Sequence, residues 1–260
     1  MKDAIIHNLG AIQQRINNAC EKCKRHPGEV RLLLATKPVP AGRILMALQA
    51  GQTLIGENKA QEIKEKYDAL KDIPHETHFI GHLQTNKIKD ILKYGVSCVQ
   101  SVDRRELAEK LHQRLLFENK KMNVLIQVNT SNEKSKFGVH PDEAVNLVEQ
   151  VARLETLQIK GLMTIGLFHA ENEKVRQCFR LLKNIQQEII SQNIPNVAME
   201  ELSMGMSGDL DMAVEEGATI VRVGTAIFGK RVYPDEYYWN ESEKADPWAS
   251  RSSYQGKDDD

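Results

Sequence analysis

The chain has 260 residues, 41% of them hydrophobic and 27% charged, with a formal net charge of -1 at pH 7. This composition is typical of a globular protein with apolar material for one large core. The near-neutral balance gives no electrostatic support to a nucleic-acid partner, and no apolar stretch approaches the roughly 20 residues that cross a membrane. The first residues lack the apolar core of a secretion signal, so we expect a cytoplasmic protein, with a mitochondrial location left open.

The first segment, residues 3–24, is expected to form an amphipathic helix that ends near His26. Its apolar side chains recur at helical spacing, at Ile5, Ile6, Leu9, Ile12, Ile16 and Cys20. Cys20 and Cys23 have the C-x-x-C spacing that suits zinc or redox chemistry, but no second such pair completes a tetrahedral site. We therefore expect two reduced thiols on a helix and no metal site.

Short apolar runs and longer helical patterns then alternate along the chain. The expected strands are 30–36, 53–56, 77–80, 97–101, 123–129, 158–165, 200–204 and 219–223. The helical patterns lie near 41–50, 59–70, 85–94, 104–118, 141–153, 171–192 and 208–217. Strands separated by helices pair in parallel, and eight such units are the number of a closed barrel. The sequence thus predicts an α/β fold, a single (β/α)8 TIM-like barrel, with an open doubly wound sheet as the alternative.

The barrel and its extra N-terminal helix are expected to occupy residues 1–232. From Tyr233 onward the composition changes, with Trp239, Trp248 and a run of terminal acidic residues. We expect residues 233–260 to form a C-terminal extension that is partly disordered.

Lys37 is the most informative polar residue at the end of an expected strand. Active-site groups of such barrels stand at the carboxyl ends of the strands and in the loops that follow. Lys37 leaves the apolar run 31–36 and precedes Pro38, so its amine would start inside the barrel mouth. Burial there favours the neutral amine, which attacks an aldehyde to form a Schiff base. A solvated lysine that caps the strand is the alternative reading.

The loops after the last two expected strands have the composition of a phosphate site. The run from Ser203 to Ser207 opens a helix, and Gly224 and Thr225 follow the eighth strand. Backbone N–H groups at a helix start attract phosphate, and phosphate sites in barrels are often built from these two loops. A plain N-cap formed by Ser207 is the alternative. Lys37 and this site would hold the two ends of a phosphorylated aldehyde.

Arg222 and His82 each have two possible roles. Arg222 would contact the phosphate or a ring nitrogen of the same ligand, or serve as a structural arginine within a strand. A guanidinium facing a pyridine nitrogen would keep that nitrogen unprotonated, which makes the ring a poor electron sink. His82 is a candidate general base, and structural hydrogen bonding explains it equally well.

Taken together, these motifs resemble the pyridoxal phosphate homeostasis proteins, also called the proline synthetase co-transcribed family. The matching stretches are 35–38, 55–58 with Gln61 and Glu62, 78–87, 101–103, Asn129 with 136–139, 161–164, and 201–209 running on to 217–229. The resemblance covers about residues 30–231. Lys59 departs from it, because the family usually has an aromatic residue after the Glu-Asn pair.

The resemblance implies a fold-type III barrel for pyridoxal 5'-phosphate (PLP), similar to the barrel domain of bacterial alanine racemase. It implies that Lys37 holds PLP covalently as an internal aldimine and that no residue is catalytic. The cofactor-binding residues that follow are Lys37, Asn58, His82, Ser203, Met204, Gly205, Ser207, Arg222, Gly224 and Thr225.

Three functions are compared on this basis. The first is a PLP-binding protein of PLP homeostasis, which stores the cofactor and supplies it to PLP-dependent apo-enzymes without substantial catalysis. The second is an amino-acid racemase, which needs acid–base groups on both faces of the bound cofactor. In alanine racemase a tyrosine from a second domain serves one face, and no such domain is visible here, which also favours a monomer. The third, a PLP-free sugar-phosphate enzyme, leaves Lys37 less well explained. We expect the first.

Overall fold

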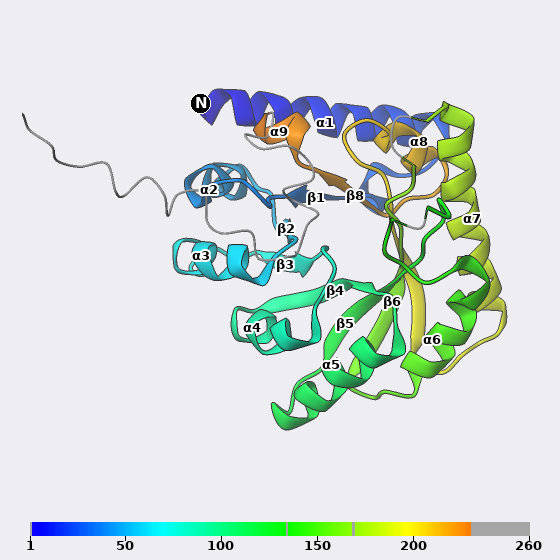
Figure 1. Cartoon of the computed structure of the whole chain (residues 1–260). Helices are drawn as coiled ribbons and strands as arrows, with labels where there is room; N and C mark the ends of the chain where they lie inside the picture. Colours follow the sequence, from blue (N-terminus) through cyan, green and yellow to red (C-terminus); the bar gives the residue numbers. More distant parts are fainter. Residues whose placement is uncertain (1, 134, 168–169, 230–260) are drawn as a thin grey trace, which may run out of the picture. The chain divides into compact units, whose positions relative to one another are not determined.

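The eight apolar runs of the sequence form eight parallel strands that close into a barrel in the computed structural model of the chain (Figure 1). The structure describes residues 2–133, 135–167 and 170–229. The strands are β1 Arg31–Ala35, β2 Leu54–Glu57, β3 Glu76–Phe79, β4 Val96–Val102, β5 Met122–Gln127, β6 Leu157–Met163, β7 Val197–Ser203 and β8 Ile220–Val223. Because β8 pairs back onto β1, the predicted TIM-like barrel is confirmed and the open doubly wound sheet is wrong.

Helices alternate with the strands and cover the outside of the barrel (Figure 1). They are α1 Lys2–Lys22, α2 Ala41–Gln49, α3 Ala60–Leu70, α4 Ile88–Lys93, α5 Arg105–Phe117, α6 Ala144–Ala152, α7 Asn172–Ser191, α8 Leu210–Glu215 and α9 Thr225–Phe228, with 3₁₀ turns η1 Pro27–Glu29, η2 Thr85–Lys87 and η3 Pro141–Glu143. The extra N-terminal helix is confirmed as α1. The extension expected at 233–260 lies outside the described residues.

Strand β1 shows why these runs are almost continuously apolar. Leu32 and Leu34 pack in the large core between the strands and the helices, whereas Leu33 joins Leu54 and Ile220 in a small separate cluster on the other face of the sheet. Strands of a closed parallel barrel are buried on both faces, so they lack an alternating polar pattern. A polar side chain buried in such a barrel therefore needs a hydrogen-bond partner.

Helix α1 packs against α8 and α9, close to the end of the described chain (Figure 1). Its buried face follows the predicted helical spacing, with Ile5, Leu9, Ile12, Ile16, Ala19 and Cys20 in the core. Cys20 is buried in this helix, and the half-buried Cys23 lies in the turn directly after it; both are free thiols. In the described part of the chain no group of three or more His, Cys, Asp or Glu side chains is arranged to hold a metal ion.

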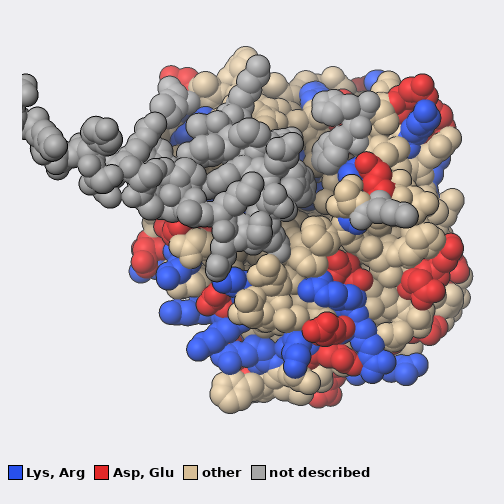
Figure 2. Space-filling view, viewed as in Figure 1, with Lys and Arg blue, Asp and Glu red and all other residues tan. Residues whose placement is uncertain are grey.

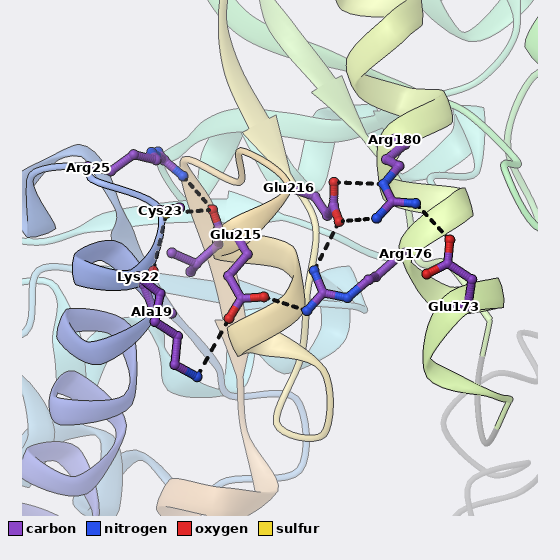
Figure 3. A network of polar contacts seen from close by, with 10 residues as sticks. Ala19, Lys22, Cys23, Arg25, Glu173, Arg176, Arg180, Glu215 and Glu216 are labelled. Atoms are coloured by element: carbon purple, nitrogen blue, oxygen red, sulfur yellow. Dashed lines mark hydrogen bonds and ion pairs between the residues drawn. The ribbon is translucent and has the colours of Figure 1, made fainter.

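A network of ion pairs joins α1, α7 and α8 on the outside of the barrel (Figure 3). Arg176 of α7 pairs with both Glu215 and Glu216, and Arg180 pairs with Glu216. Lys22 of α1 lies 3.8 Å from the Glu215 carboxylate. The network therefore connects the first helix to two late ones.

Several predicted boundaries differ from the structure by up to three residues, and one helix was not predicted. Strand β7 begins at Val197, three residues before the expected start, directly after Asn196, whose φ of 63° ends the preceding turn. The helix expected at 208–217 begins at Leu210. Helix α9 was not expected, because four residues are too few to show a helical period.

The surface agrees with the near-neutral composition. On the face shown in Figure 2, basic and acidic side chains lie interspersed. None of the helices in the described ranges is both long enough and apolar enough to cross a membrane.

Candidate functional site

Lys37 lies directly after β1, and its side chain is buried with 6% of the residue exposed. The turn that contains it is fixed by a lysine from α3. The Lys66 ammonium donates to the Thr36 carbonyl oxygen at 2.8 Å and to the Lys37 carbonyl oxygen at 3.1 Å. The Thr36 hydroxyl donates to Oε1 of Glu57 at 2.6 Å. The structure therefore holds Lys37 at the carboxyl end of the first strand, where the sequence predicted it.

Asn58 and His82 follow the next two strands and belong to the same end of the barrel. Asn58 is buried, and its carbonyl oxygen packs so closely on Gly81 that a side chain at Gly81 would overlap it. His82 stacks on Phe137, with ring centroids 3.9 Å apart. The first contact joins the loops after β2 and β3, and the second joins the loop after β3 to the segment between β5 and η3.

Asp103 also lies beside the His82 ring, with its Oδ2 3.6 Å from His82 Nδ1. Arg104 pairs with the same carboxylate at 2.6 Å. Burial raises the pKa of Asp103, but the neighbouring His82 and the charge of Arg104 outweigh burial and lower the pKa of Asp103 overall. The carboxylate is therefore ionised at neutral pH and can orient the imidazole. This arrangement is compatible with His82 as a general base and with His82 as a structural hydrogen-bonding residue.

The loops after β7 and β8 meet at the end of β1. Ser207 Oγ and Thr225 Oγ1 are 3.4 Å apart. A Cβ at Gly224 would lie 2.7 Å from the Ala35 carbonyl oxygen, so this glycine allows the loop after β8 to approach the strand that carries Lys37. The residues predicted to bind phosphate and the predicted lysine thus lie on adjacent segments.

Helix α1 supports both of these loops, which the sequence did not indicate. Arg15 donates to the Ser207 carbonyl oxygen at 2.9 Å and pairs with Asp211. The Asn8 side chain donates to the Ile227 carbonyl oxygen in α9 at 3.0 Å. The N-cap residue of α8 is Asp209, so the alternative reading of Ser207 as a plain N-cap is wrong.

Arg222, with 5% of the residue exposed, has defined partners for its guanidinium inside the barrel. One terminal nitrogen donates to Ser203 Oγ at 2.8 Å and the other to the Thr164 carbonyl oxygen at 2.7 Å. Burial lowers the pKa of Arg222 to about 10, against the opposing effect of the Asp209 charge. Arg222 therefore stays protonated at neutral pH. Met204, the residue after Ser203, is fully buried.

A chain of hydrogen bonds continues from Ser203 through the barrel. The Ser203 hydroxyl donates to Gln100 Oε1 at 2.6 Å, and Gln100 Nε2 lies 2.7 Å from His78 Nδ1. Since an amide nitrogen only donates, His78 Nδ1 must accept, and the ring proton sits on Nε2, 3.4 Å from the Glu76 carboxylate. Each group in this chain donates a hydrogen bond to the next, from Arg222 at one end to Glu76 at the other. The Ser203 hydroxyl therefore accepts one of these hydrogen bonds and donates another.

Comparison with known proteins places the chain among PLP-related barrels. The family model described as "Alanine racemase, N-terminal domain" matches residues 3–232. A protein of Aquifex aeolicus named pyridoxal phosphate homeostasis protein is 43% identical over 86% of this chain and 97% of its own length. One of the same name from Pasteurella multocida is 41% identical over 88% of this chain and 98% of its own.

A solved structure agrees with these relatives. PipY of Synechococcus elongatus, with PLP bound, superposes with a TM-score of 0.76 and 31% sequence identity, covering 86% of this chain and all of its own.

Proposed function

Since this chain belongs to the alanine racemase N-terminal domain family, and within it to the pyridoxal phosphate homeostasis proteins, we propose that it binds PLP in intracellular PLP homeostasis. The proposed role is to hold the cofactor and supply it to other enzymes, with no substantial catalysis of its own. The sequence-based expectations of a cytoplasmic location and a monomeric state are part of this proposal. The PLP-bound state of PipY, a relative of the same fold, supports it.

One observation carries the proposal. The buried Lys37 turn and the loop of Gly224 are in contact, through the close approach of Gly224 to Ala35. The lysine that we propose to capture the aldehyde and the loop pair that we propose to bind phosphate therefore lie next to each other at one end of the barrel. When bound, PLP supplies an aldehyde that reacts with an amine and a ring that can act as an electron sink.

We propose the following roles for the chain's own residues. Lys37 forms the covalent link, and Ser207, Thr225 and the backbone of Gly205 and Gly224 hold the phosphate. Asn58, His82, Ser203 and Met204 shape the surrounding cavity wall, and Arg222 contributes a positive charge. Because its guanidinium stays protonated, Arg222 would disfavour a protonated ring nitrogen beside it and so weaken carbanion chemistry.

The two tyrosines of the described residues lie side by side. Tyr67 and Tyr94 pack edge to face, with ring centroids 5.2 Å apart. Both line a cavity between α3, α4 and the strands that these helices cover. The lining of this cavity includes no residue of the loops after β7 and β8. We therefore propose neither tyrosine as the acid–base group for the second face of the bound cofactor.

The covalent link is tested by substituting Lys37. Wild-type protein mixed with PLP should be yellow, and borohydride reduction should fix PLP on the peptide that contains Lys37. We expect K37A to lose both signals, because the variant lacks the only amine proposed to reach the aldehyde. The matched control is Lys59→Ala, a half-buried lysine after β2, which should keep both. A colourless wild type, or labelling that survives in K37A, would overturn the proposal.

Absence of racemase turnover is the second expectation. PLP-loaded protein is incubated with single L-amino acids, and the D-enantiomers are measured by chiral chromatography. We expect rates far below about 1 per second, the lower end of ordinary enzyme turnover. A rate at or above that value would replace storage by racemisation as the function.

A further inference from the structure

Two buried side chains and a half-buried one behind Lys37 form a polar cluster that the PLP-binding role leaves unexplained. They are Glu57 at the end of β2 and Glu62 and Lys66 on α3. Lys66 donates to Glu57 Oε1 at 2.8 Å, in addition to the carbonyl oxygens of Thr36 and Lys37. An ammonium group has three N–H donors, so all three are used, two of them on the Lys37 turn.

The carboxyl groups of Glu57 and Glu62 each have one buried oxygen, Oε2, without a hydrogen-bond partner. Burial, the negative charge of Glu57 and a hydrogen bond between the two carboxyl groups raise the pKa of Glu62 to about 9. Glu57 Oε1 accepts from both Thr36 and Lys66. A proton on Glu62, shared with Glu57, would give both Oε2 atoms a partner.

We propose that Glu57, Glu62 and Lys66 are positioning residues for Lys37, which fix the Thr36–Lys37 peptide and so set the direction in which the PLP lysine leaves β1. The inference rests on the proposed function, because that function supplies PLP as the ligand. The contacts of the cluster with the turn supply the mechanism. With Glu62 protonated, the charges of Glu57 and Lys66 cancel, so the turn is held by a cluster without net charge. Lys66 is the member that touches the turn directly.

Other titratable groups surround the cluster and must be considered with it. Lys59, at the start of α3, acts on Glu62 through its charge. A cavity of about 240 Å³ opens beside Glu57 and Lys66, and its further titratable lining residues are Tyr67 and Lys71 from α3, His75 before β3, and Tyr94 after α4. The cavity is large enough to hold several water molecules.

The positioning role is tested through PLP release at pH 7. Lys66→Met keeps the length of the side chain and removes its donors. Charged hydrogen bonds of this kind stabilise by an amount that corresponds to roughly tenfold or more in a rate. We therefore expect K66M to release PLP about tenfold faster than wild type, as measured by transfer to an apo-enzyme trap.

The matched control is Lys71→Met, at the residue directly after α3, where an exposed lysine pairs with Asp68 at 3.0 Å. It should release PLP at the wild-type rate. Circular dichroism establishes that the variants are folded, and Lys66→Gln replaces K66M if K66M does not fold. A folded K66M or K66Q that releases PLP as slowly as wild type refutes the positioning role.

The shared proton is tested without PLP. The pKa of Glu62 is raised in the folded state, so its contribution to stability is full below the unfolded value of 4.5 and is lost as pH rises through about 9. The melting temperature of PLP-free wild type should fall between pH 6 and pH 9. Glu62→Gln, a neutral isostere of the protonated acid, should remove much of this fall, whereas the exposed Glu65→Gln should not.

The two measurements separate the two proposals. If wild type forms no covalent PLP adduct, the proposed function fails while the pH profile still tests the cluster. If E62Q follows the wild-type profile, the shared proton is refuted even though PLP binds.

Discussion

At the scale of single residues, the loop after β7 depends on one glycine. Gly205 has a φ of 90°, which L-residues rarely adopt. A Cβ at this position would overlap the Cβ of Ala213 in α8. The carbonyl oxygen of Gly205 also accepts from the backbone N–H of Arg222 at 2.9 Å, so the position of this glycine is tied to β8. A side chain here would strain the backbone and the contact between loop and helix together.

Gly205→Ala should therefore destabilise the protein. Backbone strain at positive φ and overpacking each cost on the order of 1–3 kcal/mol, so we expect a loss of about 2 kcal/mol or more in the free energy of unfolding. Urea denaturation measures it. Gly208→Ala in the same loop is the control, because a Cβ there meets no atom within 4 Å. Equal stability of the two variants would contradict this account.

The residues of the candidate site differ in how far the sequence could predict them. Lys37, Gly224 and Thr225 follow strands directly, so a local pattern located them. Arg15 and Lys66 could not be found in this way, because each lies on a helix and contacts a loop distant in sequence. Gln100 carries a weaker signal, since it is a fully buried polar residue within an apolar strand. Its partners were set by how the strands meet in the barrel.

At the scale of elements, the outer helices are joined by charges as well as by apolar contacts. Arg176 lies between two glutamates of the α8 segment, and its side chain is 25% exposed (Figure 3). Hydrogen bonds with both glutamates raise the pKa of Arg176. A network with shared partners stabilises more than an isolated surface pair. The alternation of strands and helices was predictable, but these links between helices were not, since charges on exposed faces show no period.

Arg176→Met should weaken the attachment of α7 to α8. We expect a loss of about 1 kcal/mol in the free energy of unfolding, and a smaller loss at 1 M salt, where charges are screened. Arg105→Met is the control, because Arg105 pairs with Glu109 within one exposed helix. Thermal denaturation at low and high salt measures both variants. A loss for R176M that does not depend on salt would point to packing in place of charge.

At the scale of the whole molecule, the hydrogen-bond chain through the barrel makes stability depend on pH. Burial lowers the pKa of His78 from 6.5 to about 4, against the opposing charge of Glu76. A depressed histidine pKa gives a stability contribution that is present above pH 6.5 and is lost as pH falls toward about 4. Glu62 acts in the opposite sense, so between pH 4.5 and 6.5 the two effects offset each other.

His78→Gln should isolate the histidine effect. Relative to wild type, we expect this variant to gain about 2 kcal/mol in the free energy of unfolding when pH is lowered from 7 to 5, because wild type alone must keep a neutral imidazole. Urea denaturation at both pH values gives the difference. His140→Gln, at an exposed histidine, is the control and should show little change. A pH-independent difference for H78Q would mean that His78 does not resist protonation.

The closure of the barrel has a consequence for how the protein is made. Strand β1 completes its pairing only with β8, Arg31 lying opposite Ile220, and α1 packs on α8 and α9. During synthesis the first helix and one edge of the first strand must therefore wait for almost the whole described chain to leave the ribosome. An unpaired strand edge is a site for aggregation during that interval. The contact that seals the sheet thus also sets a slow, late step in folding, when the nascent chain depends most on chaperones.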